Sequence, residues 1–194
     1  MKKLLVILLI LMGTSLSLAV FFRPDIRPGY GVTETKWLSY YFEPLEGTNM
    51  DTVVYFMDSG KAGPTFLLMG GTHAMEIAGT VAATIFIENA IVERGRVIVI
   101  PFSNSSGASI ATVFYPNQPD HFLQIQSKSG PRFLVYGDRN TDVNDQGRPD
   151  PEVYLHYPSG QELPGYESRN LNRNYPGRPD GTPTEKLAFA IMEL

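Results

Sequence analysis

Residues 65–101 read TFLLMGGTHAMEIAGTVAATIFIENAIVERGRVIVIP, and this stretch decides the fold. The apolar run Thr65–Met69 has the length of a strand that is buried on both faces. From Glu76 to Glu93, apolar residues recur at i, i+4 spacing and predict a helix that Gly95 closes. Val97–Ile100 predicts a second buried strand. Strand, helix and strand in this order predict a βαβ unit, and therefore an α/β fold with a mostly parallel or mixed sheet flanked by helices.

The segments before this unit add two predicted strands. Lys36–Phe42 is rich in aromatic residues, and Thr52–Met57 is a run of β-branched, aromatic and other apolar side chains. From residue 103 to residue 180 the chain turns polar, and there only Arg132–Tyr136 has the composition of a strand. So long a span with little regular structure indicates a functional region.

The last segment begins with a helix-start signal. Thr182 stands at the N-cap position, Pro183 at the first helical position, and Glu185 completes a capping box, so we expect a helix to Leu194. No strand follows it in the sequence. We therefore expect residues 36–194 to be the N-terminal part of a longer α/β domain, truncated at its C-terminus.

Composition narrows the classes of function. Of 194 residues, 43% are hydrophobic, which excludes a mostly disordered chain. The net charge is −4 with no basic block, so we expect no nucleic-acid partner. Cysteine is absent, which excludes disulfides and thiolate metal sites. A metal ion would need His, Asp or Glu ligands, and the histidines are His73, His121 and His156.

Residues 1–22 have the pattern of a signal peptide or a membrane anchor. A short basic start with Lys2 and Lys3 precedes an uncharged run, and Ser17 and Ala19 fit a cleavage site. We expect export to the periplasm or the medium, with membrane contact through this segment alone if it stays uncleaved. Residues 23–35, rich in Pro and Gly, are expected to be a linker.

The sharpest chemical signal is Gly70-Gly71-Thr72-His73-Ala74-Met75-Glu76. His73 and Glu76 are three residues apart, so we expect them to share one face of a first helical turn, at the carboxyl end of a parallel strand. An imidazole and a carboxylate supply two of the three protein ligands of a catalytic zinc ion. The alternative is a capped helix with a structural histidine.

A second signal is Asn170-Leu171-Asn172-Arg173-Asn174-Tyr175-Pro176-Gly177. Asn172 offers an amide, and Arg173 offers a guanidinium that can grip a carboxylate with two hydrogen bonds. The alternative is a solvated turn.

The two motifs, in this order, resemble those of the zinc carboxypeptidase-like superfamily, and most closely its aspartoacylase/succinylglutamate desuccinylase branch. The resemblance covers roughly Thr52 to Leu194. It implies that His73 and Glu76 are Zn²⁺ ligands and that Asn172 and Arg173 hold a substrate carboxylate. Asn170 stands where the family carries Asp, which we expect to weaken any supporting role of that residue at the metal.

The family's third ligand, a histidine, and its general base come later in the chain, so we expect both beyond Leu194. His121 and His156 precede the Asn-Arg motif, and we expect them to be ordinary loop histidines. The resemblance implies a zinc-dependent hydrolase that cleaves the amide bond of an N-acyl amino acid or a related carboxylate substrate. The alternatives are an exported metallocarboxypeptidase that acts on peptides and a non-catalytic binding domain of the same fold.

Overall fold

The structure is a computed structural model that describes residues 24–110 and 122–194. Its strands are β1 (Glu34–Trp37), β2 (Val53–Asp58), β3 (Thr65–Met69), β4 (Arg96–Ile100), β5 (Phe122–Ser127), β6 (Gly130–Val135), β7 (Val153–Leu155) and β8 (Glu162–Pro164). Its α-helices are α2 (Ile77–Asn89), α3 (Ser105–Ala108) and α4 (Pro183–Met192). Its 3-10 helices are η1 (Leu38–Tyr40), η2 (Glu43–Leu45), η3 (Val143–Gln146), η4 (Gly165–Arg169) and η5 (Leu171–Arg173).

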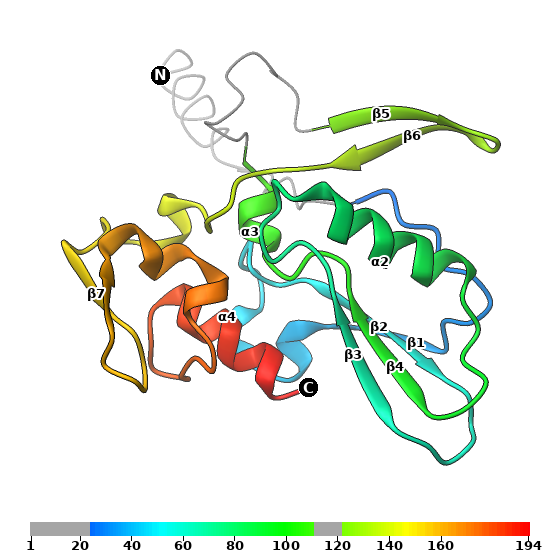
Figure 1. Cartoon of the computed structure of the whole chain (residues 1–194), viewed down its shortest axis with the longest axis horizontal. Coiled ribbons are helices and arrows are strands. Elements are labelled where there is room, and N and C mark those ends of the chain that lie inside the picture. The colour runs from blue at the N-terminus through cyan, green and yellow to red at the C-terminus, as the bar shows by residue number, and fades with distance from the viewer. Residues whose placement is uncertain (1–23, 111–121) are drawn as a thin grey trace, which may run out of the picture.

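The central sheet has the strand order β1-β2-β4-β3 (Figure 1). β3 and β4 pair in parallel, with Thr65 opposite Arg96 and Met69 opposite Ile100. The β1–β2 and β2–β4 pairs are antiparallel. Because α2 connects the parallel strands, the predicted βαβ unit is confirmed, and the fold is α/β with a mixed sheet.

Alternate residues of the two central strands pack on opposite faces of this sheet. One face contributes to a core cluster shared with α4: Val54, Phe56, Ile98 and Ile100. The other face contributes to a cluster shared with α2: Tyr55, Met57 and Val99. The sheet is thus sandwiched between α2 on one side and α4 with its neighbouring turns on the other.

The prediction that Thr65–Met69 is buried on both faces is wrong. Within the described residues β3 lies at an edge of the sheet, and Phe66 and Leu67 are 59% and 38% exposed. An apolar run predicts a strand, but the burial of that strand depends on which neighbours cover it. β3 pairs only with β4 within the described residues. β4 pairs with both β2 and β3, and its residues Ile98–Ile100 are buried as predicted.

Other predicted boundaries also need correction. The first strand is Glu34–Trp37 rather than Lys36–Phe42, because the chain turns into η1 at Leu38, whose side chain is fully buried. α2 ends at Asn89 rather than at Glu93, four residues earlier in the chain than expected. Gly95 does not close this helix. It has a φ of +76° in the turn before β4, where a Cβ atom would lie 2.3 Å from the Pro64 carbonyl oxygen.

The polar span contains more regular structure than the sequence predicts. β5 and β6 form an antiparallel hairpin in which Ser127 pairs with Gly130, and β7 pairs with β8. The helix after Thr182 is confirmed, with its capping box: Glu185 N–H donates to Thr182 Oγ1 (3.2 Å), and Thr182 N–H donates to Glu185 Oε2 (2.7 Å). This helix ends at Met192, two residues before the expected end.

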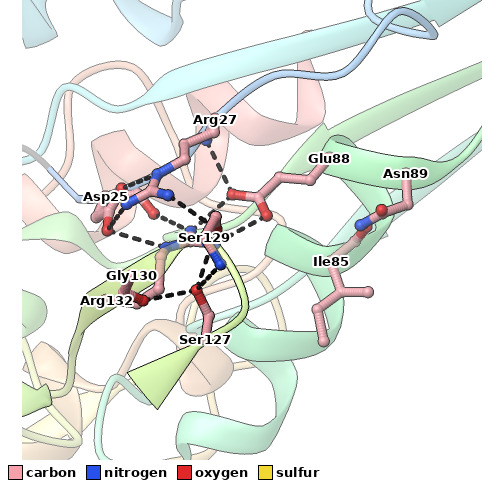
Figure 2. A network of polar contacts seen from close by, with 9 residues as sticks. All are labelled: Asp25, Arg27, Ile85, Glu88, Asn89, Ser127, Ser129, Gly130 and Arg132. Atoms are coloured by element: carbon pink, nitrogen blue, oxygen red, sulfur yellow. Dashed lines mark hydrogen bonds and ion pairs between the residues drawn. The ribbon is translucent and has the colours of Figure 1, made fainter. Parts of the chain in front are cut away.

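A network of charged side chains ties the β5–β6 hairpin to α2 (Figure 2). Arg132 of β6 donates to both carboxylate oxygens of Glu88, at 2.7 and 3.1 Å, and to Asp25 Oδ2 at 2.9 Å. Arg27 donates to Asp25 Oδ1 at 3.0 Å. The side chains of Arg132 and Glu88 are 11% and 13% exposed, so this pair is largely shielded from water, whereas Arg27 is 47% exposed. Arg27, in the expected linker 23–35, thus contacts α2 and the hairpin, whereas Glu34 and Thr35 of that range belong to β1.

The proposed targeting segment 1–22 and His121 lie outside the described residues. Within residues 24–110 and 122–194, no helix is long and apolar enough to cross a membrane.

Candidate functional site

His73 and Glu76 lie in the turn between β3 and α2, rather than in the first turn of the helix as predicted. Glu76 is the N-cap of α2, and its N–H donates to the His73 carbonyl oxygen at 3.0 Å. Gly71 makes this turn possible with a φ of +64°, where a Cβ atom would lie 3.1 Å from both the Pro101 carbonyl oxygen and Thr80 Oγ1. The backbone therefore reverses directly at the carboxyl end of β3.

The two side chains nevertheless converge. His73 Nδ1 lies 3.0 Å from Glu76 Oε1. The imidazole is 12% exposed, while the Glu76 carboxylate is 70% exposed. The structure thus presents one nitrogen and one carboxylate oxygen side by side, with the carboxylate reaching into solvent.

The other ring nitrogen of His73 meets Asn170. His73 Nε2 lies 2.9 Å from Asn170 Oδ1, and the same oxygen accepts a hydrogen bond from Asn172 N–H at 3.2 Å. Asn170 is fully buried and caps η5. Asn170 thus accepts a hydrogen bond where the family's Asp would, but it brings no negative charge, and the expectation that it supports His73 more weakly than Asp stays a prediction.

These contacts determine the chemistry that the ring can perform. An amide oxygen can only accept, so the contact with Asn170 places the proton of a neutral His73 on Nε2. Nδ1 then carries a lone pair, directed at an oxygen that also lacks a proton. Two acceptors at this distance are satisfied by a proton, which makes His73 an imidazolium paired with Glu76, or by a metal ion bound to both atoms. The pair fits a zinc ion as two of its ligands, with Asn170 in the outer position that usually orients a metal-binding histidine.

No third His, Asp or Glu joins this pair among the residues that the structure describes. His156 is engaged elsewhere, since its Nδ1 lies 2.7 Å from Ser159 Oγ and its Nε2 lies 2.8 Å from the Tyr175 carbonyl oxygen. Within the described residues, His73 and Glu76 thus stand as a pair of possible ligands, and their role in binding zinc stays a prediction.

The structure adds Glu167 and Arg139, which sequence reasoning missed. Glu167 Oε2 accepts a hydrogen bond from Asn170 Nδ2, and Glu167 Oε1 lies 3.8 Å from Arg139 Nη2. Glu167 is 8% exposed. The position of Glu167 three residues before Asn170 is a weak signal, and Arg139 lies too far away in the sequence for any spacing rule to connect the two.

The backbone after β6 is hydrogen-bonded to the turn between β3 and α2. Ala74 N–H donates to the Asp138 carbonyl oxygen at 3.1 Å, and Gly137 N–H donates to the Ala74 carbonyl oxygen at 3.2 Å. Ala74 is buried and packs with Phe102 and Val135. The hairpin is thereby connected directly to the segment that carries His73.

Asn172 and Arg173 lie in η5, directly after the residue that contacts His73. Both are exposed. Within the described residues, the Arg173 guanidinium makes no hydrogen bond or ion pair. The fold thus brings the predicted carboxylate-binding pair to the neighbourhood of the turn that carries His73 and Glu76, and their role in binding a substrate stays a prediction.

A buried polar network holds η5 in place. Asn174 Nδ2 donates to the carbonyl oxygens of Glu167 and Asn170, at 3.1 and 2.7 Å. The Tyr154 hydroxyl lies 2.9 Å from Asn174 Oδ1 and 3.2 Å from Glu185 Oε1. Burial, together with the nearby Glu185 carboxylate, raises the pKa of the Tyr154 hydroxyl, so it stays a hydrogen-bond donor.

Comparison with known proteins gives matches among solved structures. No family model and no curated protein matches the chain. An aspartoacylase family protein from Mesorhizobium loti is 20% identical, with a TM-score of 0.45, over 89% of this chain and 38% of that one.

A succinylglutamate desuccinylase from a Silicibacter species is 23% identical, with a TM-score of 0.40, over 72% of this chain and 28% of that one. A succinylglutamate desuccinylase/aspartoacylase from Rhodobacter sphaeroides is 21% identical, with a TM-score of 0.39, over the same shares. The chain thus spans less than two fifths of these proteins, and its structural neighbours include aspartoacylase and succinylglutamate desuccinylase family proteins.

Proposed function

We propose that this chain supplies two zinc ligands, His73 and Glu76, to a metal-dependent hydrolase that cleaves the amide bond of an N-acyl amino acid or a related carboxylate. One observation carries the proposal: His73 Nδ1 faces Glu76 Oε1 at 3.0 Å while Asn170 engages the other ring nitrogen. In a neutral His73 with its proton on Nε2, two acceptors face each other at this position, and a metal ion bound to both would satisfy them.

The residues of the chain have distinct tasks in this proposal. His73 and Glu76 hold the ion, which when bound activates water and polarises a carbonyl group. Arg173 grips the substrate carboxylate with two parallel hydrogen bonds, and Asn172 adds an amide contact. Because η5 is fixed to His73 through Asn170, binding at Arg173 orients the scissile carbonyl relative to the ion.

A second candidate is a binding domain of the same fold that has no catalytic activity. The observation that favours it is the exposed Arg173, whose guanidinium makes no hydrogen bond or ion pair within the described residues. Such a domain would bind a carboxylate-bearing ligand at Arg173 without turnover. In either case we propose an exported protein, since the pattern of residues 1–22 is the sequence feature that bears on localisation.

Equilibrium dialysis of the 194-residue chain against zinc tests the metal site. Because the third ligand is expected beyond Leu194, we expect weak but measurable binding in the wild type and a loss of at least about tenfold in affinity in His73→Ala and in Glu76→Ala. His156→Ala is the matched control, because both of its ring nitrogens are already engaged, and its zinc affinity should equal that of the wild type. Equal affinity in the wild type and His73→Ala contradicts the proposal.

Calorimetric titration tests the ligand class. We expect an N-acetyl amino acid to bind more tightly than the same compound with its carboxylate converted to an amide. Arg173→Ala should abolish this preference, so that the binding free energy of the carboxylate compound becomes less favourable by about 1–3 kcal/mol. Arg173→Lys should restore part of it, because lysine keeps the charge and loses the bidentate geometry. A preference that survives in Arg173→Ala removes the carboxylate-binding role.

A further inference from the structure

Asn170 connects His73 to a buried carboxylate. Its amide oxygen accepts from His73 and from Asn172 N–H, and its amide nitrogen donates to Glu167 Oε2. Asn170 is 0% exposed and Glu167 is 8% exposed, so water does not replace these contacts. Each side-chain hydrogen-bonding atom of Asn170 therefore has a partner that fixes which end of the amide faces the ring.

We propose that Glu167 is a positioning residue for His73, and that Glu167 and Asn170 together form a relay that takes the place of a single carboxylate at the ring. Glu167 can only accept, so it holds the Asn170 nitrogen towards itself and the Asn170 oxygen towards His73 Nε2. The effect of this relay on zinc affinity rests on the function proposed above. Its effect on the orientation of the His73 ring does not depend on that proposal.

The opposite orientation of the amide is unfavourable for two reasons. It would direct the Asn170 oxygen at the Glu167 carboxylate, so that two buried acceptors face each other. It would also leave Asn172 N–H without its acceptor. Its consequence at the ring is that an N–H group would face His73 Nε2, and the proton of the neutral imidazole would move to Nδ1. A proton on Nδ1 blocks metal binding there. Glu167 thereby keeps the proton of a neutral His73 away from Nδ1, through the hydrogen bond from Asn170 to Glu167 and the one from His73 to Asn170.

The relay also moves negative charge away from the ring. A carboxylate hydrogen-bonded to a histidine raises the basicity of the ring, and here the neutral amide stands between the two. Arg139 Nη2, 3.8 Å from Glu167 Oε1, provides partial compensation for the buried charge. The negative charge at the relay can therefore be relocated by mutation without changing the number of charges in this cluster.

A pair of isosteric substitutions performs this relocation. Asn170→Asp keeps the acceptor for His73 and the cap of η5, but it places a second carboxylate against Glu167, so we expect a lower urea midpoint. Glu167→Gln removes the charge that holds the amide, so we expect about tenfold weaker zinc binding with the fold intact. In Asn170→Asp/Glu167→Gln, the new amide donates to the new carboxylate. We expect both the midpoint and the zinc affinity to recover.

Glu185→Gln is the matched control. Glu185 is also a buried carboxylate next to an arginine, at 3.2 Å from Arg178 Nε, but no hydrogen bond links its side chain to Asn170. We expect this variant to lower stability and to leave zinc affinity unchanged. If Glu167 were merely structural, Glu167→Gln would also lower stability and leave zinc affinity unchanged. The change in zinc-binding free energy of Asn170→Asp/Glu167→Gln would then equal the sum of the two single effects.

Ring nitrogen NMR of the zinc-free, ¹⁵N-labelled full chain separates the two proposals. We expect the wild type to show the proton of neutral His73 on Nε2, and Glu167→Gln to show an increased share of the Nδ1–H form. This result together with no zinc binding in the wild type would overturn the metal proposal and leave the relay standing. An unchanged tautomer and unchanged zinc affinity in Glu167→Gln would overturn the relay, whatever the wild type binds.

Discussion

His73 Nε2 lies 2.9 Å from Asn170 Oδ1, although 97 residues separate the two in the sequence. This contact joins the turn after β3 to η5 and holds the imidazole in one orientation. Because Asn170 also caps η5 and bonds Glu167, one buried amide connects the predicted metal ligands to the predicted carboxylate-binding turn.

Asn170→Ala should lower the free energy of unfolding by at least about 2 kcal/mol, because it removes a helix cap and leaves buried partners unsatisfied. Urea denaturation measures this change. Asn172→Ala is the control in the same turn, since Asn172 is exposed, and it should change stability by less than about 0.5 kcal/mol. Equal effects of the two substitutions would contradict the structural role of Asn170.

Tyr154→Phe should lower the free energy of unfolding by about 1–3 kcal/mol, because Asn174 Oδ1 and the buried Glu185 carboxylate both lose their contact with the Tyr154 hydroxyl. Thermal and urea unfolding measure the loss. Tyr166→Phe removes the same atom from a side chain that is 50% exposed, and it should be nearly neutral. A neutral Tyr154→Phe would show that water replaces the hydroxyl in this network.

Arg132→Ala should destabilise the protein by about 3 kcal/mol, because it leaves the Glu88 and Asp25 carboxylates partly buried without their shared partner. Hydrogen exchange should accelerate in residues 122–135 more than in β2 and β4. Arg96→Ala is the control, because the side chains of Arg96 and Asp58 are 49% and 36% exposed. This variant should lower the free energy of unfolding by less than about 1 kcal/mol. Uniform acceleration across the chain would contradict a local role in holding the hairpin.

Acid should weaken the same network through Asp25. Burial alone raises the pKa of Asp25, but hydrogen bonds from Arg27 and Arg132 outweigh it and lower this pKa below its usual 3.8. A carboxyl whose pKa is lower in the folded state stabilises the fold above the unfolded pKa and loses this contribution as the pH falls through the folded pKa.

The difference in urea midpoint between the wild type and Asp25→Asn should therefore be constant from pH 7 to about pH 5 and shrink below about pH 4. A difference that grows on acidification would show that Asp25 is not held by its arginine partners.

The sequence by itself determined the elements whose signals are local. The βαβ order follows from two apolar runs around a helical repeat, and the start of α4 follows from its capping box, because both depend on neighbours within a few residues. The same local pattern predicted the convergence of His73 and Glu76, although they meet in a turn and not on a helix.

Only the tertiary structure decided which surfaces are covered and which distant residues meet. The apolar run of β3 could not reveal that its strand lies at an edge, because burial depends on neighbouring strands rather than on composition. Likewise, the resemblance related Asn170 to the metal ligands, but the local sequence does not show that its amide lies against His73 Nε2. Its support of His73 arises because η5 packs against the turn after β3, where burial excludes water and makes the orientation of one amide decisive.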